Sequence, residues 1–577
     1  MLVMSFPTVY ARHTDEAPLD LLASMLGEGK SSLLYRNLVA TGKAVNVNVY
    51  HPCRELGCAF TVTATLNPDG SASLAQLYDA VRRSLKEAVA AGVSEAELEK
   101  LQNGIEAGMV HQLETVAGKV SLLANGEIFG GQPDQNSADL ARYQAVTVAD
   151  VQRVYAGYLA NKPAVVVSVV APGQSFTAVA PDNFYMVQLS PLAPLDDLLG
   201  DEPKTAPLLS PLGEHGPLRP RPAVAAGVQM EAPQFWRARL ANGIPLLGIT
   251  QHESPGVNLL LSLEGGILAE PPGKDGVATL TALMLEESTL RHSAEEMDLA
   301  IARMGSQIEA RVAGRYTEFS MFALEEHVGD SLRLLRERLF EPALNADEFA
   351  KVKARYRQQL LHQQQVPSVR AEQEAQAVLY GGQRVGRPQG GTPESIARIT
   401  LADVQDYYRR AYSAGVASFS LVSPLSASQW EGALAQFGGW KKTQVELFVP
   451  DKSRFPVNLS GSVRIVNLPG SPQTAIRVVR RAMPFAADGD YFAAQLVNYP
   501  LGGAFNSRLN LKLREEHGYT YGASSRFVGG KDTGQFVVAT DVREDVSVAA
   551  TKVILQQLSR FQQQGMSDEE LAHMRQA

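Results

Sequence analysis

The segment Leu501-Gly-Gly-Ala-Phe-Asn-Ser507 decides the fold, because an earlier segment, Leu26-Gly-Glu-Gly-Lys-Ser-Ser32, repeats its pattern. In each copy a further leucine follows at the same offset within a helix-like stretch, at Leu38 and at Leu513. Self-similarity between distant parts of a chain indicates that one structural unit occurs more than once.

A second pair of matching segments lies downstream of the first pair. Gly92-Val-Ser-Glu-Ala-Glu-Leu98 corresponds to Gly565-Met-Ser-Asp-Glu-Glu-Leu571. The leucine that opens the first pair and the serine of the second pair are 68 residues apart in one copy and 66 in the other. Two matched segments at nearly equal spacing predict the same unit near both ends of the chain.

A third copy is visible in the later half of the unit. Thr147-Val-Ala-Asp-Val-Gln152 corresponds to Thr400-Leu-Ala-Asp-Val-Gln405, and apolar strand-like runs follow at 164–170 and 417–422. Threonine is a favoured N-cap residue, and an aspartate in the first turn complements the helix dipole. Both segments therefore predict helix starts.

Within each unit, strand-like and helix-like runs are mixed. Residues 60–65 and 535–540 are rich in β-branched residues, whereas 77–90 and 546–561 carry apolar residues at three-to-four spacing. The order of these runs is not a strict β-α-β alternation. We therefore predict an α+β fold of repeated layered domains with partly antiparallel sheets.

A proline-rich segment separates the first two units. Residues 172–233 hold eleven of the 32 prolines in the chain, which predicts an extended connector. The predicted division is 1–175 for the first unit, 176–233 for the linker, 234–430 for the second unit and 455–577 for the third. The third unit stops inside the helix that opens at Ser567, so we expect the chain to be a piece of a longer protein.

Bulk composition excludes several functional classes. The 577 residues are 45% hydrophobic and carry a net charge of −8, without the basic stripe of a nucleic-acid-binding protein. No apolar run reaches the roughly 18 residues of a membrane span. The first residues lack the basic and apolar regions of a signal peptide.

The chain has two cysteines, Cys53 and Cys58. We interpret them as two free thiols in a hairpin, with a disulfide as the alternative. Without neighbouring cysteine or histidine ligands they are not expected to complete a tetrahedral zinc site.

Four segments carry a resemblance to a known family: Asn242-Gly-Ile-Pro-Leu246, Gly265-Gly-Ile-Leu-Ala-Glu270, Gly276–Leu285 and Leu501–Ser525. Together they resemble the pitrilysin/insulinase family of zinc metallopeptidases, which includes the mitochondrial processing peptidases and bacterial two-half zinc proteases. The resemblance implies four homologous domains, two in each half, that close like a clamshell around a peptide. This chain would hold the second domain, a degenerate third and most of a fourth, without the first, zinc-binding domain.

The family's zinc motif, H-x-x-E-H, places two histidine ligands and a catalytic glutamate on one helix. The matching positions here are Thr279, Ala282 and Leu283, and the family's later glutamate ligand falls near Gln359. None of these side chains replaces a zinc ligand or a general base. The resemblance therefore implies zinc in the complete enzyme, bound outside this chain, and an inactive, metal-free chain on its own.

No other zinc motif is evident. The ten histidines include no pair four residues apart. Glu325-Glu-His327 and Glu515-Glu-His517 contain only the last half of the motif, since Ala323 and Leu513 occupy the positions that need a histidine. We interpret both as surface charge on helices.

One catalytic pair is implied by the resemblance. Members of the family carry an arginine and a tyrosine seven residues apart in the fourth domain, and both reach the active site from the opposite half. The matching residues here are Arg514 and Tyr521, while the first unit has Val39 in place of Arg514. A guanidinium and a phenol can donate hydrogen bonds to a substrate carbonyl as negative charge develops on its oxygen. The alternative is purely structural: an arginine at a helix end and a tyrosine that opens a strand.

The resulting hypothesis is a part of a zinc metalloendopeptidase that supplies the non-catalytic, substrate-binding half. Its expected partners are a peptide or protein substrate and a zinc-bearing domain or subunit. The alternative is a stand-alone inactive subunit that binds peptide or scaffolds a zinc-bearing partner. An upstream reading frame with H-x-x-E-H, in frame, would favour the first. The location stays open, although Gram-negative family members of this layout are often exported to the periplasm.

Overall fold

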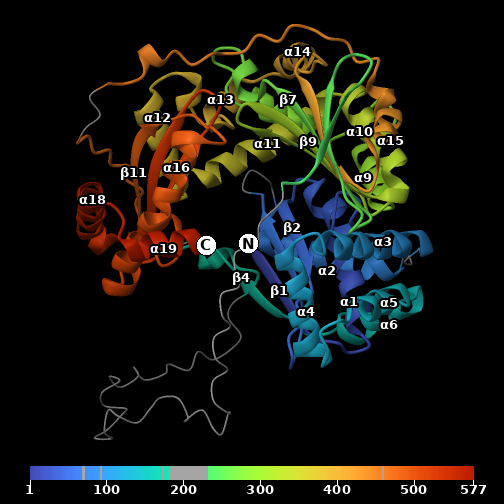
Figure 1. The fold of residues 1–577 in the computed structure, drawn as a ribbon. Helices are drawn as coiled ribbons and strands as arrows, with labels where there is room; N and C mark the ends of the chain where they lie inside the picture. Colours follow the sequence, from blue (N-terminus) through green and yellow to red (C-terminus); the bar gives the residue numbers. More distant parts are fainter. Residues whose placement is uncertain (68–71, 91–93, 172, 181–231, 458–460) are drawn as a thin grey trace, which may run out of the picture.

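The computed structural model describes residues 1–577 except 68–71, 91–93, 172, 181–231 and 458–460. Three separate sheets, each with its own helices, confirm the α+β prediction (Figure 1). Most of the predicted proline-rich connector lies outside the described residues. None of the helices in the described part of the chain is long and apolar enough to cross a membrane.

The first unit has a four-stranded antiparallel sheet in the order β2-β3-β1-β4. Its strands are β1 (Leu2–Pro7), β2 (Ala44–Tyr50), β3 (Ala59–Leu66) and β4 (Val165–Ser168). Its helices are α1 (Glu16–Gly27), α2 (Leu74–Ala90), α3 (Glu95–Gln112), α4 (Val116–Gly130), α5 (Asn136–Gln144) and α6 (Val148–Tyr158), with a π-helical turn η1 (Tyr35–Val39) and a 3₁₀ turn η2 (Ser175–Thr177). Alternate residues of β1, namely Leu2, Met4 and Phe6, are fully buried beneath the helices, as the period of two in a strand requires.

The second unit has six strands in the order β5-β6-β10-β7-β9-β8, of which only β6 and β10 pair in parallel. The strands are β5 (Phe235–Arg239), β6 (Pro245–Thr250), β7 (Gly256–Glu264), β8 (Gln307–Ala313), β9 (Tyr316–Leu324) and β10 (Ala417–Ser423). The helices are α8 (Val277–Leu285), α9 (Ala294–Ala302), α10 (Val328–Phe340), α11 (Ala346–Gln363), α12 (Pro367–Tyr380), α13 (Pro393–Arg398), α14 (Leu401–Ala411) and α15 (Ala427–Leu434), with 3₁₀ turns η3 (Gly266–Ala269), η4 (Glu325–His327), η5 (Arg384–Gly386) and η6 (Ala435–Phe437).

The core of the second unit extends beyond the predicted boundary at residue 430. Trp430, Leu434 and Phe437 are fully buried in the same apolar cluster as the sheet. The boundary was placed too early because the short helix α15 follows directly on the last strand and covers one end of the sheet.

The third unit has three antiparallel strands in the order β11-β13-β12. Its strands are β11 (Gln473–Ala482), β12 (Thr520–Gly529) and β13 (Gly534–Arg543). Its helices are α16 (Gly489–Asn498), α17 (Arg508–Asn510), α18 (Ser547–Gln564) and α19 (Asp568–Gln576), with π-helical turns η8 (Tyr499–Gly503) and η9 (Leu511–Glu516) and 3₁₀ turns η7 (Lys452–Arg454) and η10 (Glu544–Val546).

The three sheets repeat one topology. If β1 to β4 are matched in chain order to β7 to β10, the order β2-β3-β1-β4 becomes β8-β9-β7-β10, which is the order observed. The third unit follows the same rule as β12-β13-β11. The first two units therefore have the predicted common topology. They differ at one edge: β10 also pairs with β6, whereas β4 pairs only with β1 among the described strands.

The predicted helix starts are present. Thr147 and Thr400 cap α6 and α14, and each forms a reciprocal capping box with the aspartate three residues later. The leucine-glycine pairs of the repeat also have a structural reason. A Cβ at Gly27 would lie 2.7 Å from the backbone nitrogen of Val49 on β2, and one at Gly502 would lie 2.5 Å from that of Ser525 on β12. Only glycine allows this approach of a helix end to the neighbouring strand.

A disulfide joins Cys53 and Cys58, so the prediction of two free thiols is wrong. The two residues face each other across the hairpin between β2 and β3, with their Cα atoms 4.2 Å apart. This spacing is slightly shorter than the range of about 4.4–6.8 Å that is usual for a disulfide. Sequence distance alone does not reveal that the two residues are cross-strand neighbours.

A buried ion pair holds the start of α8. Glu270 is fully buried, pairs with Arg384, and accepts hydrogen bonds from the backbone N–H groups of Gly276 (2.9 Å) and Ala278 (3.1 Å). Burial raises the pKa of Glu270 to about 7, although the guanidinium and the two N–H donors oppose this shift. The carboxylate thus ties η3, α8 and the segment after α12 together.

We expect Arg384→Ala to lower the free energy of unfolding of this unit by about 3–5 kcal/mol, because it leaves Glu270 buried and unpaired. Urea-induced unfolding followed by circular dichroism measures the change. The double variant Glu270→Gln/Arg384→Met should recover much of the loss, since an amide still caps α8 without a buried charge. A double variant no more stable than Arg384→Ala would contradict the assignment.

Candidate functional site

The helix that matches the zinc motif is α8. Ala282 is 1% exposed, and Thr279 and Leu283 are half-buried on the same helix. Methyl, hydroxyl and isobutyl groups at these positions offer no imidazole and no carboxylate, so they do not fit a zinc ion.

The position aligned with the family's glutamate ligand is also without a carboxylate. Gln359 is exposed on α11. The residue of α11 that contacts Thr279 through a hydrogen bond is Tyr356, which also donates to the carbonyl of Gly390 (2.9 Å). Burial raises the pKa of Tyr356 to about 12, so it remains a neutral phenol. Neither side chain offers a carboxylate to a metal ion.

Sequence reasoning missed one cluster of potential metal ligands. Within the described residues, His51, Cys53 and Cys58 form the one group of three His, Cys, Asp or Glu side chains whose ligand atoms lie within 4.8 Å of one another. The statement that the cysteines have no neighbouring histidine was therefore wrong. The signal was present in the short spacing His51-Pro-Cys53.

The two incomplete motifs lie at the surface. The side chains of His327 and His517 are 31% and 35% exposed, and each is about 4 Å from the carboxylate of the glutamate just before it. This position agrees with their interpretation as surface charge.

Arg514 projects from the π-helical turn η9, which is anchored by the fully buried Leu513. Its side chain is 35% exposed and lies 3.4 Å from the carboxylate of the adjacent Glu515. The guanidinium also lies over the ring of Phe505, 4.7 Å from the ring centre. Single π turns are frequent at functional sites because they turn one side chain away from the regular helical position.

Tyr521 lies at a β-bulge. The pairing of β12 with β13 shifts register between Thr520 and Ala523, and the side chain of Tyr521 is 91% exposed. Its hydroxyl has no hydrogen-bond partner among the residues that the structure describes. Bulges of this kind re-aim a side chain away from the sheet, and a tyrosine so exposed contributes nothing to the core.

A shallow hollow of ≈ 290 Å³ adjoins Tyr521. It is lined by Gln473, Arg477, Thr520, Tyr521, Gly522, Ala539, Thr540 and Asp541. The guanidinium of Arg477 is only 11% exposed and lies 3.2 Å from Asp541, so its charge is already compensated. Tyr521 is an exposed member of this lining, and no hydrogen bond holds its hydroxyl among the described residues.

Exposed apolar side chains occur next to Arg514 and on α16, and these were not singled out from the sequence. Phe505, which lies under the guanidinium of Arg514, is 72% exposed, and α16 carries Phe492 (54%) and Val497 (43%). Exposed apolar side chains that cluster mark interaction surfaces in soluble proteins. Phe505 is visible in the segment Leu501–Ser507, but the sequence alone does not show that its side chain is exposed.

The first unit has the same backbone features without the same side chains. Its π turn η1 carries Val39 where η9 carries Arg514, and β2 has a register shift next to Asn46, the position that corresponds to Tyr521. Val39 packs against the core of its unit. The third unit thus uses a shared scaffold to present an arginine and a tyrosine.

Comparisons with known proteins agree with this architecture. Residues 1–105 and 398–577 match the family model described as "Peptidase M16 inactive domain", and residues 248–392 match "Insulinase (Peptidase family M16)". The chain is 22% identical over 312 residues to an uncharacterized zinc protease of Streptomyces coelicolor, a match that covers 52% of this chain and 66% of that protein. It is also 22% identical over 306 residues to an uncharacterized zinc protease of Bacillus subtilis, covering 52% and 72%. The chain thus spans about two thirds of the length of these relatives.

Two solved structures share the fold. The peptidase M16 inactive domain of Pseudomonas fluorescens superposes with a TM-score of 0.53 at 25% identity, over 59% of this chain and 82% of that one. A protease from Helicobacter pylori superposes with a TM-score of 0.55 at 18% identity, over 59% and 83%. With two family models that match most of its length, the chain belongs to the insulinase family of peptidases, family M16.

Proposed function

We propose that this chain supplies the substrate-binding, non-catalytic part of a zinc-dependent metalloendopeptidase, in which zinc is held outside this chain. The observation that carries the proposal is the exposed pair in the third unit: Arg514 on a π turn and Tyr521 at a bulge. The third unit thus presents two hydrogen-bond donors to solvent. The second unit beside it has no metal ligand at the positions of the zinc motif.

The contacts of Arg514 leave it available to a substrate. Its carboxylate partner, Glu515, is itself 55% exposed, and ion pairs between exposed side chains contribute little free energy. A peptide carbonyl can therefore replace Glu515 at small cost, while the ring of Phe505 keeps the guanidinium in place. In the proposed role Arg514 and Tyr521 donate hydrogen bonds to the carbonyl oxygen of the scissile peptide and stabilise its developing charge.

A surface of the first unit supports the need for a zinc-bearing partner. Helix α12 of the second unit buries Leu379 and Tyr380 against the third unit, where Arg481 donates to the carbonyl of Leu379 (3.4 Å) and the hydroxyl of Tyr380 donates to the carbonyl of Gly534 (3.1 Å).

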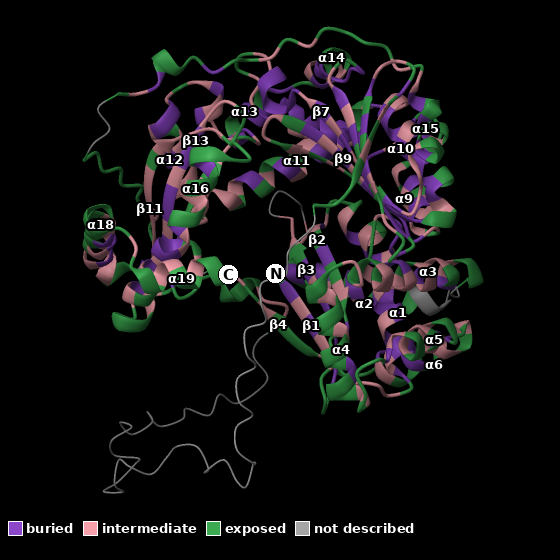
Figure 2. Cartoon of the chain, in the orientation of Figure 1, coloured by how far each residue is buried: buried purple, intermediate pink, exposed green. Residues whose placement is uncertain are grey.

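The matching positions on α4 are Ile128 and Phe129, which are 67% and 36% exposed. Most residues of α4 are exposed, as the colouring of this helix in Figure 2 shows. Two further apolar side chains of α4, Val116 and Val120, are 79% and 59% exposed. The repeat therefore has an apolar docking surface, covered by a neighbouring unit in one copy and open in the other. We propose that a further α+β unit of the same repeat, one that bears the zinc motif, occupies it, either in the same protein or as a separate subunit.

We expect the purified chain to show no peptide hydrolysis with or without added zinc, because Thr279, Ala282 and Leu283 cannot hold a hydrolytic metal. A quenched fluorescent peptide library measures cleavage. Chelator-sensitive cleavage by the chain alone would overturn the assignment.

In an enzyme reconstituted with its zinc-bearing part, Arg514→Ala and Tyr521→Phe should each reduce kcat by about 10²–10³-fold, equivalent to about 3–4 kcal/mol, with zinc content unchanged. The double variant should lose less than the sum, because both groups contact the same charge. The matched controls are Arg526→Ala and Tyr10→Phe. Arg526 is an exposed arginine of β12, the strand that carries Tyr521, and Tyr10 is an exposed tyrosine of the first unit. Single variants with undiminished activity would return the pair to a structural role.

We expect Ile128→Asp to weaken association with the zinc-bearing part at least tenfold, since burial of an isoleucine is worth about 1.5–3 kcal/mol. Isothermal titration calorimetry against that part measures the change. Val548→Asp, on the exposed face of α18, is the control and should leave the affinity unaltered. Equal affinities for both variants would show that α4 is not the docking surface.

A further inference from the structure

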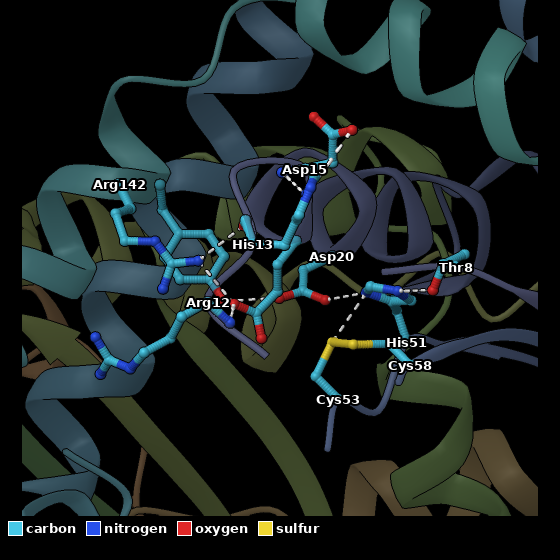
Figure 3. Close-up of a disulfide and its surroundings, with 11 residues drawn as sticks. Thr8, Arg12, His13, Asp15, Asp20, His51, Cys53, Cys58 and Arg142 are labelled. Carbon is cyan, nitrogen blue, oxygen red and sulfur yellow. Dashed lines mark hydrogen bonds and ion pairs between the residues drawn. A yellow bond between two sulfur atoms is a disulfide. The ribbon is translucent and has the colours of Figure 1, made fainter. Parts of the chain in front are cut away.

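The disulfide of the first unit lies beside a buried histidine (Figure 3). His51 follows β2 directly, and its side chain is fully buried. The sulfur of Cys53 is 3.8 Å from Nδ1 of His51, and a carboxylate oxygen of Asp20 on α1 is 2.7 Å from the same nitrogen. Two sulfurs and one imidazole nitrogen therefore lie within 4.8 Å of one another, and the Asp20 carboxylate approaches this group from α1 through its contact with that nitrogen.

The separation of sulfur and nitrogen matches the ligand shell of a tetrahedral metal, whereas the 2.7 Å between Asp20 and His51 is a hydrogen-bond distance that widens when a metal replaces the proton. Zinc binds sulfur at about 2.3 Å and nitrogen or oxygen at about 2.0–2.2 Å, so its ligand atoms lie roughly 3–4 Å apart. The 3.8 Å between Cys53 and His51 falls within that range. Reduction of the disulfide would let the two sulfurs separate and give Cys53 and Cys58 two free donors.

The surrounding hydrogen bonds are those of a supported metal site. In the disulfide state Nδ1–H of His51 donates to the Asp20 carboxylate (2.7 Å), and the hydroxyl of Thr8 donates to Nε2 (2.7 Å). A metal at Nδ1 requires the other tautomer, in which Nε2–H donates to Thr8 Oγ1 and the Nδ1 lone pair is free. The hydroxyl of Tyr143 donates to the second oxygen of Asp20 (2.7 Å). Burial and the Asp20 charge raise the pKa of Tyr143, which keeps it a donor. Partners of this kind orient the ligands of metal sites.

We propose that the first unit carries a redox-gated metal site, in which reduced Cys53 and Cys58, with His51 and Asp20, bind a divalent thiophilic cation such as zinc. In the oxidised chain the disulfide joins the two sulfurs, so that they are not available as thiolate ligands. The site is separate from Arg514 and Tyr521 and does not depend on the function proposed for them.

The chemistry balances with a dithiol reductant. The reductant delivers two electrons and two protons to the Cys53–Cys58 bond and is itself oxidised to a disulfide, which leaves two thiols in the hairpin. Metal binding then releases both thiol protons as the sulfurs become thiolate ligands. A disulfide oxidant takes up two electrons from the ligated thiolates and two protons from water and is reduced to two thiols, which reforms the Cys53–Cys58 bond and releases the metal.

Cobalt(II) tests the site in the full chain without any assay of activity. We expect the reduced chain to bind one equivalent and to develop the near-ultraviolet charge-transfer absorption of a thiolate–cobalt complex, which zinc should then displace. The oxidised wild-type chain, which needs no substitution, should show none. Cys53→Ser/Cys58→Ser, with its fold checked by circular dichroism, should also show none under reducing conditions.

Tyr143→Phe identifies the role of Asp20. Loss of the hydroxyl that orients this carboxylate should weaken metal affinity about 10–100-fold. Tyr158→Phe is the matched control, since Tyr158 donates to Asp15, outside the site, and it should leave the affinity unchanged. A reduced wild-type chain without thiolate–cobalt absorption, or Tyr143→Phe with wild-type affinity, would overturn the proposal.

Discussion

The close contact between a helix end and the strand that follows it underlies the arrangement of the first and third units. A Cβ at Gly502 would lie 2.2 Å from Oγ of Ser525, so the helix end can touch β12 only because glycine has no side chain. The π turn η9 also packs against β12. Arg514 and Tyr521 are thus carried by two elements that pack against each other, a more rigid basis than a loop would provide.

The features that the sequence predicted well depend on short-range signals or on the repeat itself. Thr147 and Thr400 cap their helices as their side-chain chemistry requires. The matched spacing of the leucine-glycine and serine-glutamate segments predicted the common topology, because a sequence unit that occurs more than once folds into the same structural unit each time. The absence of ligands at Thr279, Ala282 and Leu283 also needed only residue identity.

The features that the sequence did not reveal concern contacts that only the folded chain brings together. Cys53 and Cys58 appear unpaired until the hairpin places them opposite each other. The exposure of Tyr521 follows from a bulge in β12, which the residue types around it do not reveal. Long-range geometry, rather than local propensity, decided both.

The open edge of the first sheet has a consequence for the behaviour of the chain in isolation. Val165 and Val167 of β4 are 65% and 47% exposed. The strand carries neither a charged residue nor a proline, which are the residues that discourage further strand pairing at a sheet edge. In the second unit β6 occupies the corresponding edge. Among the described residues, no strand pairs with the edge of β4 that faces away from β1. Such a valine-rich edge is a template for intermolecular β-pairing, so its exposure favours self-association and aggregation. Coverage of β4 would serve solubility as well as assembly.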